Sequence, residues 1–337
     1  MSYNQNSGYG QALINAVHAA VPTFGRIFVV LDPDDTDEEN YQKMQEVFAP
    51  KEGIVRFYTS LSDAYDATES NNNDVIVLDG NSTHTLTAEL NVAKSRVHFV
   101  GLDYLMGVHR KQGQSSKINI GVTTDTGDVS AILNTGVRNS FRGLKISSTN
   151  TTLAQALYAF ADGGEYTYME DCEVVFLGKL TTTTVADFAC NADTGMYVNC
   201  AFGSTAQEIT ANGTRPNVLV SGAAVAAGKK LRDCRFVDCD FLYKCGDTDN
   251  RLVYGANATD VERMLTFENC KFFNNPLSAQ KPGVAVDFGA GQTEGAVLLD
   301  AACSIVDITV MGATGEGVYT LAPSSPTYAT SGLSVNS

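Results

Sequence analysis

The sequence predicts a mainly β fold: a right-handed parallel β-helix solenoid with a small α/β cap at its N-terminal end. A short unit of the form Asn-Cys-x-Phe recurs along the chain, as at Asn199–Phe202. The residue before each anchor is of a type that tolerates a sharp, left-handed bend. Charged residues are only 18% of the chain, and Gly, Ser, Thr and Asn are abundant. These observations favour short strands joined by turns.

The repeat is explained by two short strands, each with alternating inward and outward side chains, that meet at one bend residue. After the bend, the anchor and the residue two places later both point inward. The anchors recur at intervals of 28–42 residues, as expected for a solenoid whose loops differ in length. The copies are Phe99–Tyr104, Phe141–Ile146, Met169–Val174, Tyr197–Phe202, Leu231–Phe236 and Phe267–Phe272, with a degraded copy around Cys303. The bend residues are Gly101, Gly143, Asp171, Asn199, Asp233 and Asn269.

Stacking these copies predicts an interior ladder of anchor side chains and outward charge pairs. The ladder would contain Leu144, Cys172, Cys200, Cys234 and Cys270. The expected outward pairs are Arg142–Glu170, Lys145–Glu173 and Arg232–Glu268, each worth about 0.2–1 kcal/mol. An irregular β-sandwich with strands ending in Asn-Cys or Asp-Cys is the alternative. The joint recurrence of the bend residue and both apolar slots favours the solenoid.

The pattern divides the chain into three regions. Residues 1–55 predict an α/β cap or attachment region, with helices over 11–20 and 37–48 and a strand over 26–31. Residues 56–312 form the predicted β-helix, which a helix over 60–69 would cover at its open end. Residues 313–337 predict an extended tail, rich in small residues, that would be ordered only against a neighbour.

Charge and composition exclude several classes of partner. The net charge is −15, and no Lys/Arg cluster resembles a phosphate-binding face, so we expect no nucleic-acid partner. No run of about 18 apolar residues predicts a membrane span. The N-terminal residues do not resemble a signal peptide. The eight cysteines are therefore expected to be reduced, in a protein made in a cytoplasm and not secreted by a signal peptide.

Two features resemble the pectin-lyase-like right-handed β-helix superfamily. They are the helix-then-strand entry, Ser60–Ala67 followed by Asp74–Leu78, and the Asn-Cys-x-Phe coil. The resemblance covers roughly residues 56–312. The N-terminal segments Gln11–Pro22, Asn40–Gln42 and Gln45–Phe48 are similar to structural proteins of tailed bacteriophages. This second resemblance implies a virion component.

Candidate catalytic residues are few. The superfamily's hydrolases carry Asp-Asp, Gly-His-Gly and Arg-Ile-Lys motifs, and this chain has only Asp34-Asp35, in its N-terminal region. The nearest approach to a carboxylate cluster is Asp238, Asp240, Asp247 and Asp249, with Lys244 and Arg251 close by in sequence. Such a cluster could serve a glycosidase. Solvated turn and outward-face residues are the favoured interpretation.

Metal, protease and histidine sites are not expected. Cys234, Cys239 and Cys245 lack the close pair usual for zinc, so a reduced interior ladder explains them better. Asp32–Asp37 lacks the glycine of a calcium loop. Asp125–Gly127 and Asp193–Gly195 are interpreted as turns. The scattered histidines predict no pair with a nucleophile. We therefore expect no catalytic residues, cofactor or metal.

Three functions are compatible with these features of the sequence. The leading hypothesis is a non-catalytic phage structural protein that decorates the capsid or forms a fibre-like projection. Its expected partners are other virion proteins, mainly capsid, and further copies of itself; the resemblance to phage β-helix proteins favours a trimer. The first alternative is a tailspike-type polysaccharide depolymerase, which needs Asp238–Asp249 to line a groove. A carbohydrate-binding solenoid ranks last because the chain has no Trp.

Overall fold

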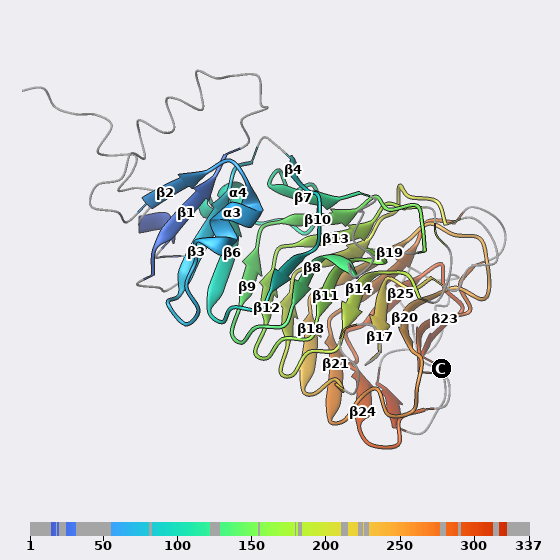
Figure 1. Cartoon of the computed structure of the whole chain (residues 1–337). Helices are drawn as coiled ribbons and strands as arrows, with labels where there is room; N and C mark the ends of the chain where they lie inside the picture. The colour runs from blue at the N-terminus through green and yellow to red at the C-terminus, as the bar shows by residue number, and fades with distance from the viewer. Residues whose placement is uncertain are drawn as a thin grey trace, which may run out of the picture.

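The described part of the chain is a parallel β-helix whose coils stack along one axis (Figure 1). The computed structural model describes residues 15–17, 19, 25–31, 55–80, 83–121, 129–153, 156–178, 180, 184–209, 215–221, 225, 229–276, 281–288, 291–312 and 317–321. The helix expected over 37–48 and most of the predicted tail lie outside these residues.

Three sheets of parallel strands make up the walls of the solenoid. Each full coil contributes one strand to each sheet in turn, as β12, β13 and β14 do. Sheet A has the order β2 (Val55–Tyr58), β1 (Ile27–Val30), β3 (Asp74–Leu78), β6 (Val97–Gly101), β9 (Ser140–Arg142), β12 (Tyr168–Glu170), β15 (Met196–Val198), β18 (Cys234–Val237), β21 (Met264–Glu268), β24 (Ala296–Leu299) and β27 (Val318–Thr320).

Sheets B and C follow the same axis. Sheet B has the order β25 (Ser304–Val306), β22 (Lys271–Asn274), β19 (Asp240–Tyr243), β16 (Ala201–Gly203), β13 (Glu173–Phe176), β10 (Lys145–Ser148), β7 (Lys117–Ile120) and β4 (Thr83–Leu86). Sheet C has the order β26 (Val310–Gly312), β23 (Val284–Asp287), β20 (Arg251–Gly255), β17 (Val218–Val220), β14 (Ala186–Cys190), β11 (Tyr158–Asp162), β8 (Ser130–Asn134) and β5 (Leu90–Val92).

Left-handed residues turn the chain at two corners of each coil. At the corner from sheet A to sheet B, the positive-φ residues are Gly143, Asp171, Asn199, Asp238 and Asn269. At the corner from sheet C to sheet A they are Arg96, Arg138, Tyr166, Thr194 and Asp233. The predicted bends at 143, 171, 199 and 269 are therefore confirmed at the A–B corner. A single residue in the left-handed conformation bends the chain and shifts the alternation of inward and outward side chains by one position, without adding further residues to the coil.

The thiol ladder exists, but one rung differs from the prediction. Cys172, Cys200, Cys239, Cys270 and Cys303 stack in register inside the A–B corner. The sequence predicts Cys234 in this ladder, but that residue lies at the C–A corner instead, aligned with Leu265. Its bend residue, Asp233, has a positive φ, as the bend residues of the A–B corner do. The local sequence around Cys234 is therefore compatible with either corner.

A regular hydrogen bond explains why cysteine suits these anchors. The thiol of Cys239 lies 3.3 Å from the carbonyl oxygen of Tyr197, and that of Cys270 lies 3.3 Å from the carbonyl oxygen of Phe236. Each thiol thus donates to the sheet A strand of the preceding coil. A buried carbonyl needs such a donor, and Cys is also small and apolar enough for the stack.

The N-terminal elements close one end of the solenoid. Helix α3 (Leu61–Asp66) begins at Ser60, whose side chain accepts from the Asp63 amide, and it buries Leu61, Ala64 and Tyr65 in the main core. Strand β1, within the predicted cap, continues sheet A. The bend predicted at Gly101 is wrong: its φ is −72°, and helix α4 (Leu102–Leu105) begins there.

Candidate functional site

The four predicted carboxylates do not gather at one place. Asp238 and Asp240 lie at the A–B corner, at the start of β19. Asp247 and Asp249 follow the opposite end of the same strand. Asp238 Oδ1 accepts from Asn269 Nδ2 at 2.5 Å. A glycosidase needs two carboxyl groups facing one bond, and a strand of four residues separates these two pairs.

A segment that we call the strap, residues 106–116, runs outside the A–B corner and engages its carboxylates. His109 Nδ1 lies 2.8 Å from Asp171 Oδ2. Lys111 Nζ lies 3.0 Å from Asp240 Oδ1, across 129 positions of sequence. The Gly113 amide donates to Glu173 Oε2 at 2.8 Å. Asp240, which the sequence predicts to be a solvated turn or outward-face residue, is partly exposed and forms an ion pair with Lys111.

Sheet A also carries a histidine–serine pair that the sequence did not predict. His98 Nδ1 lies 2.8 Å from Ser140 Oγ, and Arg142 Nη1 donates to the same Oγ at 2.8 Å. The register of β6 and β9 sets His98 beside Ser140. Burial, with help from Arg142, lowers the pKa of His98 to about 4. Such an imidazole is neutral at pH 7 but too weak a base to activate a serine efficiently.

His98 is expected to weaken the fold as the pH falls from about 6.5 to about 4. The unfolded chain protonates this histidine near its ordinary pKa of 6.5, whereas the folded chain holds it neutral to about 4. Stability present at pH 7 is therefore lost through this window. We expect His98→Gln to reduce the difference between urea midpoints at pH 7 and pH 4.5. Equal differences in wild type and variant would contradict this assignment.

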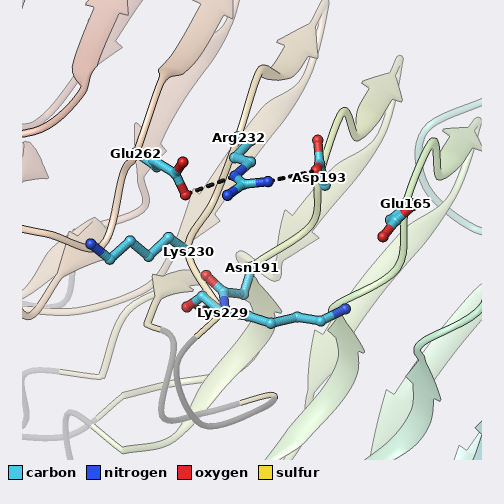
Figure 2. Close-up of a pocket in the computed structure, with 7 residues that line it drawn as sticks. All are labelled: Glu165, Asn191, Asp193, Lys229, Lys230, Arg232 and Glu262. Carbon is cyan, nitrogen blue, oxygen red and sulfur yellow. Dashed lines mark hydrogen bonds and ion pairs between the residues drawn. The ribbon is translucent and has the colours of Figure 1, made fainter.

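A polar groove lies at the C–A corner and crosses several coils (Figure 2). Its volume is about 170 Å³. Arg232 lies between two carboxylates, with Nε 2.7 Å from Glu262 Oε2 and Nη1 3.5 Å from Asp193 Oδ2. The other lining residues are Glu165, Asn191, Lys229 and Lys230. Asp193, which the sequence placed in a turn, belongs to this groove.

The cysteines considered for zinc occupy separate positions in the core. Cys234 lies at the C–A corner and Cys239 in the thiol ladder, while Cys245 follows β19. Within the residues that the structure describes, no group of three or more His, Cys, Asp or Glu side chains could hold a metal ion. Over the same residues, no helix is both long and apolar enough to cross a membrane.

Comparisons with known proteins give structural likeness only. No protein-family model matches the sequence, and no curated protein is similar to it. The deglycosylated pectin methylesterase of Aspergillus niger is similar in structure, with 14% identity, coverage of 88% of this chain and 84% of that chain, and a TM-score of 0.55. A second form of the same enzyme, which retains an N-acetylglucosamine stub, has the same identity and coverage and a TM-score of 0.53.

A viral protein is also similar, at a level too low to support a functional assignment. The ORF18 product of Geobacillus virus E2 has 14% identity and a TM-score of 0.38, with 77% of this chain and 54% of that chain covered. Identities this low establish a shared fold and no shared activity. The chain has the right-handed parallel β-helix fold, the pectin-lyase-like fold that pectin methylesterases also have.

Proposed function

We propose that this chain is a non-catalytic structural component of a tailed-bacteriophage particle, either capsid-decorating or fibre-like. The observation that carries the non-catalytic part is the use of Asp238 and Asp240 in contacts between coils and with the strap. The phage assignment rests on the resemblance of Gln11–Pro22 and the nearby N-terminal segments to phage structural proteins.

The physical character of the solenoid supports this role. Its core is one continuous cluster that runs from Phe28 to Val318 along the axis, so the coils support one another as a rod. A net charge of −15 keeps such rods apart in solution until a specific partner binds them. Capsid proteins and further copies of the chain, most simply in a trimer, are the proposed partners.

Deletion of residues 313–337 tests the assembly role. The deletion removes β27, the last strand of sheet A. We expect the preceding coils to stay folded, because a solenoid needs only neighbouring coils, and self-association and incorporation into particles to be lost. Analytical ultracentrifugation reports the first property, and mass spectrometry of purified particles reports the second. A truncated chain with unchanged mass in solution and normal incorporation would overturn this part of the proposal.

The alternative is a polysaccharide-processing enzyme of the tailspike kind. The fold, which is shared with enzymes named for their action on pectin, favours it, and the His98–Ser140 contact supplies a residue whose part in any turnover can be tested. Incubation with capsular, lipopolysaccharide and pectin-like glycans distinguishes the two functions. We expect no new reducing ends, unsaturated ends or released alcohol. Turnover abolished by Ser140→Ala or Asp240→Asn would replace the structural role with the enzymatic one.

A further inference from the structure

A row of side chains follows the C–A corner at the N-terminal end of the solenoid. Arg96, Arg138 and Tyr166, which we call the arginine row, occupy the left-handed bends of three successive coils, with φ of 57°, 60° and 55°. Backbone hydrogen bonds align them, since the Arg96 amide donates to the Val137 carbonyl oxygen and the Arg138 amide to that of Glu165. Strands of neighbouring coils are about 4.8 Å apart, so the two arginines follow one another at that spacing.

The bend itself does not explain why these residue types stand there. A positive φ is least costly for Gly, Asn and Asp, which are the residues at the equivalent bends of the A–B corner. Arginine and tyrosine in this conformation cost more free energy, and the core does not recover it, because Arg138 and Tyr166 are exposed. Strained backbone of this kind is typical of functional positions. The arginine row is therefore a candidate for contact with another molecule.

The two arginines of the row have no acidic partner among the described residues. Every other arginine of the chain except Arg56 forms an ion pair with a carboxylate. The Arg138 guanidinium lies over the Tyr166 ring, with Cζ 5.5 Å from the ring centroid, and this contact restricts its position. In a chain with a net charge of −15, these two cations are available to carboxylates from outside the chain.

A matching pair of carboxylates is exposed on helix α3, which closes the same end of the solenoid (Figure 1). Asp63 and Asp66 lie three positions apart and are exposed, whereas Leu61, Ala64 and Tyr65 of the same helix are buried. Neither carboxylate has a hydrogen-bond or ion-pair partner within the part of the chain that the structure describes. Residues three apart on a helix have Cβ atoms about 5–6 Å apart, close to the coil spacing of about 4.8 Å. The two carboxylates therefore match the two arginines in spacing and in charge.

We propose that the arginine row of one copy binds Asp63 and Asp66 of a second copy of this chain. The inference rests on the self-association proposed above and assigns residues to that contact. Arginine binds carboxylates through paired N–H···O bonds, and Arg and Tyr often dominate protein interfaces. A long polyanion would meet Glu165 and Asp193 along the same corner, whereas two carboxylates contact the row alone. In a closed oligomer, dimer or trimer, each copy uses both surfaces.

Analytical ultracentrifugation of charge-reversed variants of the full chain tests this contact. Arg96→Glu/Arg138→Glu keeps non-glycine residues at both bends and should raise the dissociation constant of self-association at least about tenfold. Asp63→Lys/Asp66→Lys breaks the same contact from the other side and should have the same effect. The variant that combines all four changes restores opposite charges, so its dissociation constant should return to within about threefold of wild type. Added salt should weaken wild-type association, because it screens exposed charges.

The control is Lys117→Glu/Lys271→Glu, which changes the net charge by the same amount at two exposed lysines of sheet B. It should associate as the wild type does. The inference is overturned if the wild type stays monomeric, if the arginine-row variant and the control associate equally, or if the four-residue reversal does not restore association. Mass spectrometry of purified particles tests the structural role separately. Absence of the wild-type chain from particles would contradict that role and leave the contact between copies standing.

Discussion

Replacement of Cys239 by aspartate is expected to lower the free energy of unfolding by several kcal/mol. Cys239 is fully buried between Cys200 and Cys270, and its thiol donates to the Tyr197 carbonyl oxygen. A carboxylate there would lose its hydration and would face the Tyr197 carbonyl oxygen, an acceptor, in place of the donating thiol. The effect should be local at first, because each coil depends on its neighbours.

Thiol labelling and chemical denaturation together measure this effect. All eight cysteines of the wild type are buried, so they should resist a thiol reagent until the chain is denatured. In Cys239→Asp we expect Cys200 and Cys270 to react under native conditions and the urea midpoint to fall. Cys239→Ala is the matched control, with a much smaller loss because it removes a hydrogen bond and adds no charge. Native labelling of wild-type Cys200 and Cys270 would contradict the ladder itself.

The repeated pattern of a bend residue followed by two inward-pointing residues was enough to predict the coil. Each corner needs one residue in the left-handed conformation and two apolar side chains close to it in sequence, so the requirement is local. The two outward pairs predicted beside this bend are present: Arg142–Glu170 at 3.4 Å and Lys145–Glu173 at 2.6 Å. Both follow from stacking equivalent positions of adjacent coils, with no loop of uncertain length between them. Where the interval between bends stayed short, the sequence therefore predicted contacts between side chains.

The same pattern predicted the wrong register in the coil where it occurs twice. Asp233-Cys234 and Asp238-Cys239 are both followed by an inward phenylalanine, and both aspartates are left-handed. The two corners of the coil make identical local demands, so the sequence could not say which one each pair occupies. The predicted pair Arg232–Glu268 fails with the register: Arg232 binds Glu262, and Arg235 binds Glu268.

The groove and the strap were beyond prediction for a different reason. Lys111 and Asp240 meet across several coils, and neither has a sequence context that identifies the other. The groove depends on the alignment of Asp193 with Arg232, which requires the corrected register. The run Lys229-Lys230-Leu231-Arg232 was the available signal, since it is a rare local concentration of cations in an acidic chain. Its significance depends on the carboxylates that the coils place beside it.

Removal of Arg215 should destabilise the fold by about 3–5 kcal/mol, the usual consequence of leaving one member of a buried ion pair alone. Arg215 is 2% exposed and lies 2.9 Å from Asp187 Oδ1. Its guanidinium also donates to the carbonyl oxygens of Phe176 and Gly178. Arg215→Met would keep much of the volume but remove the only cation paired with the Asp187 carboxylate among the described residues. That carboxylate would retain the Phe176 amide and Asn217 as donors, and the two carbonyl oxygens would lose the guanidinium.

The pH dependence of this variant distinguishes charge burial from lost packing. Burial raises the pKa of Asp187, and Arg215 opposes that rise, so Arg215→Met should raise the pKa further. A folded-state pKa above the unfolded value means that stability falls as pH rises through it. The deficit of Arg215→Met relative to wild type should therefore be larger at pH 8 than at pH 5. Adding Asp187→Asn should recover part of the loss at pH 8, because the unpaired charge is gone. A deficit that is the same at both pH values, and unchanged in the double variant, would show that Arg215 acts through packing alone.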